Sequence, residues 1–181
     1  MQISKYRYVV PVIIVALALF GAAISGCLIS GTKAFTLPIA PPAKTATGGS
    51  VNEEVVDLDE NSTFQDYKDK IRIIDRIGFR ARITENMGTA ENMSMYFSAT
   101  SNMVSATQVR AQATPLFENY PIPASGTVVI DYDQSLKILQ NFELLQELAK
   151  TGEFSIYTLA DDTFNLTFVA LEFVITFTVG L

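Results

Sequence analysis

The stretch TFNLTFVALEFVITFTVGL, residues 163–181, decides the fold class. Its apolar residues occupy even positions from Phe164 to Phe168 and odd positions from Leu171 to Leu181. Alternation with a period of two is typical of a strand with one buried face. The phase slips once, near Val169 to Leu171, and such a slip turns every later side chain to the other face. We therefore expect a β-bulge there, or a strand that breaks and changes sheets, because strands usually have about 5 or 6 residues.

The same alternation recurs in two segments upstream. From Ile77 to Thr84, the apolar side chains share one face, and Arg80 and Arg82 lie on the other. From Asn92 to Thr100, Met93, Met95 and Phe97 alternate with more polar residues. Both patterns predict half-buried strands. Further strands are expected over Val51–Leu58, Thr127–Tyr132 and Phe154–Leu159, with a short helix or turn over Phe64–Ile74 and a less regular stretch over Ser101–Gly126. The turn residues of Glu85–Gly88 and Ala160–Asp162 predict hairpin connections.

One segment has the periodicity of a helix. Between Gln134 and Lys150, apolar residues recur at helical spacing, namely Ile138, Phe142, Leu145 and Ala149, flanked by Leu139 and Leu148. Asp133 is the expected N-cap and Gly152 the expected C-terminal glycine cap.

These elements predict a mainly β fold with one amphipathic helix. The architecture expected is an antiparallel β-sandwich or a curled sheet, with the helix across one face or end. The segment from Ile77 to Asp131 places a strand, an Asn-containing turn, a second strand and the run Ile122-Pro123-Ala124 before a further strand. In this order it resembles the immunoglobulin-like sandwich of the plant desiccation-protein family. The resemblance implies a fold and says nothing about activity.

The first part of the chain has the plan of a secretory signal. Lys5 and Arg7 precede an uncharged apolar run from Val9 to Ala23, which is followed by Ile24-Ser25-Gly26-Cys27. Cys27 is the single cysteine of the 181 residues, so no intramolecular disulfide can form. The uncharged stretch from Tyr8 to Thr32 could instead cross a bilayer as an uncleaved helix. In both cases the positive charges predict that the bulk of the chain lies outside the cytoplasm.

The ending Ile24-Ser25-Gly26-Cys27 is similar to the lipobox of prokaryotic lipoprotein precursors. This resemblance implies cleavage between Gly26 and Cys27, a diacylglyceryl group and further acyl chains such as palmitate on Cys27, and a permanent anchor in the membrane. Leu28 follows, and not the Asp that retains lipoproteins in the inner membrane of enteric-type bacteria. The localisation expected is the cell membrane or, with two membranes, the outer membrane.

Composition then changes along the chain. Residues 27–50 contain Pro38, Pro41 and Pro42 and no acidic residue, which predicts a flexible tether after the signal peptide of residues 1–26. Within it, Ala34–Leu37 could pair briefly as an edge strand. Residues 51–181 are predicted to form the single β-rich domain. Cleavage before Cys27 leaves 11 basic and 19 acidic residues, so no nucleic-acid partner is expected.

Three clusters of side chains are candidate sites. Asp57, Asp59 and Asn61 open like a calcium loop, but Ser62 and Lys68 stand where that loop needs Gly and Glu, so helix caps are the preferred interpretation. Four methionines could bind Cu(I) but fit core packing better: Met87, Met93, Met95 and Met103. Arg72, Arg76, Arg80 and Arg82 could meet lipid headgroups or an acidic partner, although Asp66, Asp69 and Asp75 are interleaved with them and favour a self-compensating surface.

No catalytic motif is present in the sequence. The chain has no His, and it lacks Gly-x-Ser-x-Gly, Ser-x-x-Lys and glycine-rich phosphate loops. We expect no enzyme activity, no cofactor and no metal. The function predicted is a lipid-anchored extracytoplasmic protein with a structural or binding role in the cell envelope, contacting an envelope partner. Two alternatives stay open: a carrier of an apolar ligand in a cavity between sheet and helix, and a single-pass anchored subunit of a membrane complex.

Overall fold

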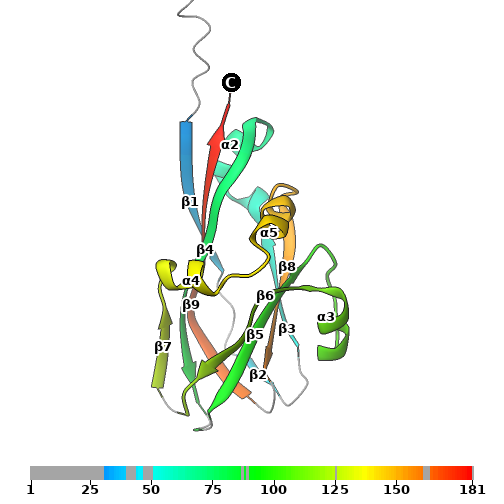
Figure 1. The fold of residues 1–181 in the computed structure, drawn as a ribbon, viewed down its shortest axis with the longest axis vertical. Coiled ribbons are helices and arrows are strands. Elements are labelled where there is room, and N and C mark those ends of the chain that lie inside the picture. Colours follow the sequence, from blue (N-terminus) through cyan, green and yellow to red (C-terminus); the bar gives the residue numbers. More distant parts are fainter. Residues whose placement is uncertain are drawn as a thin grey trace, which may run out of the picture.

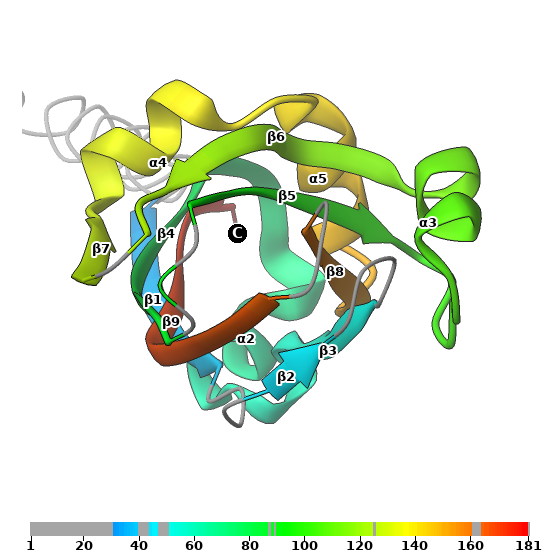
Figure 2. The same cartoon turned by 90° about the horizontal axis from the view of Figure 1, so that it is seen from below.

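The protein is a sandwich of two antiparallel sheets. The computed structural model describes residues 31–39, 44–46, 51–86, 88, 90–124, 126–160 and 164–180. One sheet has the strand order β1-β9-β4-β7, with β2 also paired to β9, and the other has the order β3-β8-β5-β6. Figures 1 and 2 show the two sheets facing each other, with the helices at their edges. The predicted fold class, a mainly β antiparallel sandwich, is confirmed.

The elements follow in chain order. The strands are β1 (Gly31–Ile39), β2 (Lys44–Ala46), β3 (Asn52–Asp57), β4 (Ile71–Glu85), β5 (Glu91–Ser98), β6 (Thr114–Ile122), β7 (Gly126–Ile130), β8 (Glu153–Ala160) and β9 (Phe164–Val179). The α-helices are α2 (Ser62–Tyr67), α3 (Ala106–Gln112), α4 (Tyr132–Ile138) and α5 (Phe142–Ala149), and the 3₁₀ turns are η1 (Leu58–Glu60) and η2 (Lys68–Lys70).

Strand β9 contains the predicted β-bulge. Ala170 pairs with Arg82 and Phe168 pairs with Ile83, so Val169 is the extra residue. The strand does not break there, because it continues for 16 residues, longer than the sequence led us to expect. It lies between β1 and β4, and pairing on both sides satisfies its backbone groups. The bulge keeps both apolar sets, Phe168 and the odd-numbered residues from Leu171, on the inner face.

The interior is filled by aromatic and aliphatic side chains from both sheets. Ile77, Phe79, Ala81 and Ile83 of β4 are buried, as predicted, while Arg80 and Arg82 are exposed. The Phe79 ring stacks on Phe117 of the opposite sheet at 5.7 Å between centroids. Phe154 and Phe173 form a second contact between the sheets, edge to face at 6.3 Å. Such pairs add specific geometry to the burial of apolar area.

Both predicted hairpins are wrong. Strand β4 pairs with β9 and β7, and β5 pairs with β6 and β8, so the connection after Glu85 crosses from one sheet to the other. The connection after Ala160 also crosses, because β8 pairs with β3 and β5, whereas β9 pairs with β1, β2 and β4. Turn residues predict that the chain reverses direction. Which strand then pairs with β4 or β8 depends on long-range pairing.

The predicted helix over Gln134–Lys150 is two helices. The chain breaks at Gln140, whose N–H donates to Leu116 O at 2.8 Å, and Asn141 has a φ of 54°. The N-cap of α4 is Asp131 and not Asp133, with a capping box to Gln134. The apolar stripe is confirmed: Leu145 and Ala149 are buried in the core, and Ile138, Leu139, Phe142 and Leu148 pack against it. Gly152, with a φ of 96°, ends α5 as expected.

Two elements lie where the sequence predicted little regular structure. Residues 101–126 contain α3 and β6, and β6 accommodates Pro115 and Pro121 because it is an edge strand. Strand β1 pairs with β9 over all nine of its residues. Residues 31–39 of the predicted tether are therefore an edge strand of the domain, longer than the brief pairing expected for Ala34–Leu37. The predicted signal peptide and Cys27 lie outside the described residues.

Candidate functional site

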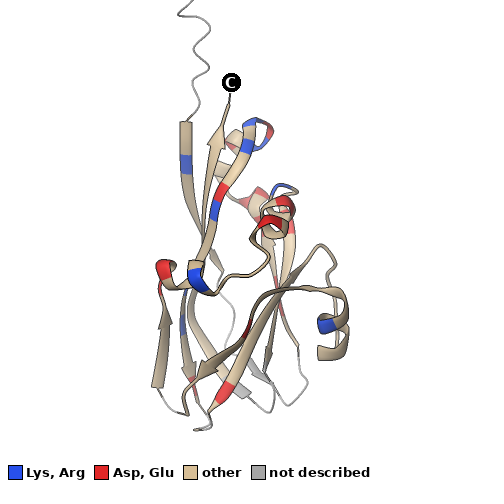
Figure 3. Cartoon of the chain, in the orientation of Figure 1, with Lys and Arg blue, Asp and Glu red and all other residues tan. Residues whose placement is uncertain are grey.

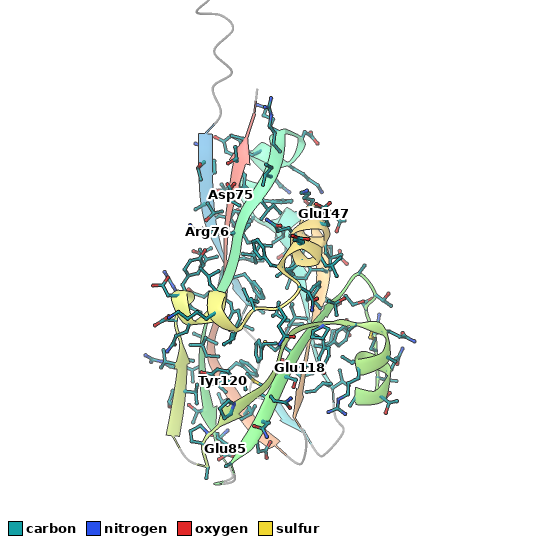
Figure 4. All side chains as sticks on the ribbon, in the orientation of Figure 1. Asp75, Arg76, Glu85, Glu118, Tyr120 and Glu147 are labelled. Carbon is teal, nitrogen blue, oxygen red and sulfur yellow. The ribbon has the colours of Figure 1, made fainter. Side chains whose placement is uncertain are left out.

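An open pocket of about 510 Å³ lies on the outer face of the five-stranded sheet. Strands β1, β4 and β9 and helix α4 supply its lining, which is Thr32, Asp75, Arg76, Arg80, Tyr132, Val174 and Thr176. Figure 4 shows Asp75 and Arg76 on the upper half of β4, above α4. The volume falls within the range of about 300–1,000 Å³ that is usual for small-molecule sites.

Helices α4 and α5 replace a strand along the edge of β4 beside this pocket. Strand β7 pairs only with Ala81–Glu85. Beyond that point the Phe79 N–H donates to Ser135 Oγ at 2.9 Å, and Ser135 Oγ donates to Tyr132 O at 2.7 Å. Gln146 Nε2 of α5 donates to Ile74 O. Side chains of the two helices thus satisfy edge groups of β4 in place of a neighbouring strand. The pocket lies on the outer face of β4, between α4 and β9.

Gly78 allows Tyr132 to form one wall of the pocket. A Cβ at Gly78 would lie 2.5 Å from Tyr132 Cε2 and 2.8 Å from Cδ2, which are distances that real Cβ atoms do not show. The ring of Tyr132 therefore lies directly against the backbone of β4, between the positions of Arg76 and Arg80. A glycine in the interior of a strand marks this kind of close approach.

The pocket carries two arginines without a carboxylate partner. Arg76 and Arg80 are exposed, and neither forms an ion pair within 4.0 Å with any side chain that the structure describes. Asp75 accepts a hydrogen bond from Thr178 Oγ1 at 2.8 Å, and Glu172 lies opposite Arg80 in the strand register. The lining therefore contains two cationic groups and one anionic group, on a chain whose net charge is −6.

Two buried tyrosines bind carboxylates on the other sheet. Glu53 accepts hydrogen bonds from Ser155 Oγ at 2.7 Å, from Tyr157 Oη at 2.9 Å and from the Asn102 N–H at 2.9 Å. Tyr96 Oη donates to Glu118 Oε1 at 2.6 Å. Burial, together with the hydrogen bond to Glu118, raises the pKa of Tyr96 to about 12, and burial also raises the pKa of Tyr157. Both phenols therefore stay protonated near neutral pH and act as hydrogen-bond donors in the packing under α3.

The predicted calcium-like cluster consists of helix caps and an ion pair. Asp57 Oδ1 accepts from the Asp59 N–H at 2.8 Å, and Asn61 Oδ1 accepts from the Phe64 N–H at 3.2 Å. Asp59 pairs with Lys68 Nζ at 2.6 Å. Within the described ranges, no three His, Cys, Asp or Glu side chains are grouped so that they could hold a metal ion.

The methionines are divided between two clusters. Met93 and Met95 are buried in the main core, and Met103 lies in a smaller cluster with Tyr96 and Tyr157 under α3. Met87 lies outside the described residues. This distribution agrees with the prediction that the thioethers fill the core.

The predicted lipidation and cleavage residues, Cys27 and Gly26, lie outside the described residues. Among the helices that are described, none is long and apolar enough to cross a membrane. Of the pocket lining, the sequence singled out Asp75, Arg76 and Arg80 but missed Tyr132, and it also missed Gly78, on which the ring of Tyr132 lies. A glycine inside the alternating run of β4 was the one available signal for a close contact.

Comparison with known proteins gives no family. No family model matches the chain, and no curated protein matches it. Among solved structures, a chain of desmodium yellow mottle tymovirus is 12% identical, with a TM-score of 0.37, covering 85% of this chain and 89% of that one. A chain of turnip yellow mosaic virus is 10% identical, with a TM-score of 0.36, covering 85% of this chain and 82% of that one. A chain of Cocksfoot mottle virus is 10% identical, with a TM-score of 0.32, covering 84% of this chain and 94% of that one. At such TM-scores the likeness is no guide to what this chain does.

Proposed function

We propose that the protein is a lipid-anchored extracytoplasmic protein of the cell envelope that acts by binding and not by catalysis. The observation that carries this proposal is the run from Val9 to Ala23 followed by Ile24-Ser25-Gly26-Cys27, with the single thiol of the chain at the position that is lipidated in proteins with a lipobox. The exposed arginines of the pocket on β4 support a binding role.

The position of β1 supports an anchored domain held close to the bilayer. Gly31 begins β1 four residues after Cys27, and four extended residues span at most about 14 Å. Gly31 pairs with Val179, and Val179 also pairs with Ile71, so three strand ends lie together at this end of the sandwich. Figure 3 shows basic segments on β1 and on the upper half of β4, toward the same end, with acidic segments interleaved on and beside β4. Basic groups there would face the headgroups of the membrane.

The apolar-ligand alternative finds less support. A second pocket, of about 440 Å³, does lie between the sheet and α5 and includes Phe97, Leu144 and Leu148. Gln112, Thr114 and Glu147 also line it, so an apolar ligand would bury polar groups at a cost. The alternative of a single-pass anchored subunit differs from the proposal in retaining residues 1–26.

Intact mass spectrometry of the membrane-extracted protein tests the proposal, with Cys27→Ala as the variant. We expect a wild-type chain that begins at Cys27 and carries acyl mass, and a variant that stays unprocessed. A matched control, Ser25→Ala, keeps a small residue before the cleavage site and should be processed normally. An unmodified wild-type chain that retains Met1 would contradict the lipoprotein and favour the transmembrane subunit.

A further inference from the structure

We propose that Arg76 and Arg80 bind the phosphate group of a phosphate ester in the pocket on the outer face of the five-stranded sheet. The two arginines lie on the same face of β4, with Gly78 and the ring of Tyr132 between them. Val174 and Thr176 of β9 also line the pocket. A group bound over these two residues is within reach of both long side chains.

The donors favour phosphate over a carboxylate. Each guanidinium presents a planar fork of N–H donors that matches two oxygens of a phosphate or a carboxylate. A carboxylate presents two oxygens in one plane, whereas a phosphate ester presents two free oxygens as a diester or three as a monoester in a tetrahedral arrangement, so that two forks can approach it from different sides. Hydroxyl groups of Thr32, Thr176 and Tyr132 add donors to the same lining. Asp75 also lines the pocket and accepts a hydrogen bond from Thr178; its negative charge opposes an anion there, so the two arginines must outweigh it.

Some cations in the described part of the domain are paired with carboxylates, and Arg76 and Arg80 are not among them. Lys68 pairs with Asp59 at 2.6 Å, and Lys150 pairs with Glu147 at 2.6 Å. Arg76 and Arg80 have no such partner among the described side chains, although Glu172 lies in register with Arg80. Two like charges along one strand repel each other, and a bound phosphate would remove that repulsion.

The place of the pocket favours a phospholipid headgroup as the source of the phosphate. Thr32, in its lining, lies five residues after Cys27, a reach of at most about 18 Å when extended. A domain anchored at Cys27 therefore holds this pocket near the phosphates of the same membrane. This assignment of the source rests on the proposed function, whereas the phosphate site itself does not.

Calorimetric titration of the full chain in an uncharged detergent tests the proposal. The ligands are inorganic phosphate, glycerol 3-phosphate, dihexanoyl phosphatidylglycerol and, as a carboxylate, acetate. We expect phosphate-bearing ligands to bind and Arg76→Gln or Arg80→Gln to weaken them at least about tenfold. Arg82→Gln is the matched control, because it removes the same exposed charge from the same strand outside the pocket. It should change binding less than about threefold, and Arg80→Lys should lie between.

The outcomes distinguish a lipid headgroup from a soluble phosphate ester, and they test the phosphate site separately from the proposed lipid anchor. Tighter binding of the short-chain lipid than of glycerol 3-phosphate would assign the site to a lipid headgroup, and equal binding would assign it to a soluble phosphate ester. No binding of any phosphate ligand, equal binding of acetate, or an equal loss in Arg82→Gln would overturn the proposal. Repeating the titration with Cys27→Ala keeps the result independent of the anchor. Thermal unfolding of each variant verifies that the exposed substitutions leave the fold intact.

Discussion

At the scale of single residues, Glu53 shows how one carboxylate holds several segments. It accepts hydrogen bonds from β8 through Ser155 and Tyr157 and from the chain before α3 through Asn102. Tyr157 is fully buried, so its phenol depends on partners inside the protein. Tyr157 Oη lies 2.7 Å from Thr100 O as well, which brings the 99–105 segment into the same network.

Glu53→Gln should lower the free energy of unfolding by about 1–3 kcal/mol, because the amide offers one oxygen where the carboxylate offers two to these donors. Urea denaturation measures the change. Glu153→Gln is the control, since Glu153 is exposed on β8 of the same sheet, and it should shift stability by less than about 0.5 kcal/mol. Equal effects of the two substitutions would contradict the role given to Glu53.

Tyr96 predicts a loss of stability in alkaline solution. Its pKa is about 12 in the folded protein against 10.0 for the ordinary value, because of burial and the hydrogen bond to Glu118. A raised pKa favours the protonated form in the folded state, so the stabilisation is complete below pH 10 and is lost as the pH rises toward 12. Unfolding measured from pH 8 to pH 11.5 should show this decline. Tyr96→Phe should make it shallower, and Tyr157 should account for part of the remainder. An unchanged slope in Tyr96→Phe would refute the assignment.

At the scale of elements, the contact between Gly78 and Tyr132 decides how α4 lies on β4. Gly78→Ala places a methyl group 2.5 Å from the Tyr132 ring, and we expect a loss of about 1–3 kcal/mol from the forced shift. In a Tyr132→Ala background the same substitution should cost less than about 1 kcal/mol. A double-mutant cycle on chemical unfolding measures the coupling, and additive effects would show that the ring does not lie on Gly78.

The bulge in β9 predicts that two deletions on one strand differ sharply. Deleting Val169 removes the extra residue and leaves Phe168 and Leu171 on the inner face in regular alternation. We expect this variant to fold, with a loss of about 1–3 kcal/mol. Deleting Val174 should prevent folding, because Ile175, Phe177 and Val179 would turn to the outer face. Soluble yield and circular dichroism distinguish the two. A folded Val174 deletion would contradict the register.

At the scale of the whole molecule, the proposed anchor at Cys27 and the strand ends predict an orientation on the membrane. Lys70 lies at the end where β1 begins, because its carbonyl accepts from the Gly180 N–H at 3.1 Å. Asn92 lies at the start of β5, near the far end of the 15-residue strand β4. At about 3.3 Å per residue, that strand separates the two ends by roughly 45–50 Å. Figure 1 shows the start of β5 at the end of the sandwich opposite the start of β1.

Fluorescent labels on Lys70→Cys and Asn92→Cys test this orientation in the membrane-anchored protein. The acylated Cys27 of the proposed function would not react, so each variant carries one label. Quenchers attached to lipid headgroups should quench the label at residue 70 several-fold more than the label at residue 92. Equal quenching would mean that the sandwich does not stand on its β1 end.

Sequence pattern alone determined β3, β4, β5, β7, β8 and β9, the buried faces of β4 and β9, and a phase slip near Val169–Leu171 where the bulge lies, but it missed β2, β6 and most of β1. These properties are local, because alternation along 77–84 or 163–181 records which side chains avoid water. The stripe of Leu145 and Ala149 was likewise visible, as were the caps formed by Asp57 and Asn61. The two arginines of the pocket could be named, but not the ring that lies between them.

Only the tertiary structure decided which strands become neighbours. The residues after Glu85 and Ala160 predict hairpins, yet both connections cross to the other sheet. Strand β1 pairs with a strand more than 130 residues later in the chain. The break at Gln140 depends on the carbonyl of Leu116 in a distant strand. The pocket arises for the same reason. Tyr132 reaches Gly78 because the pairing between β7 and β4 ends at Ile130 and Ala81. Pairing over such distances along the chain leaves no trace in local periodicity.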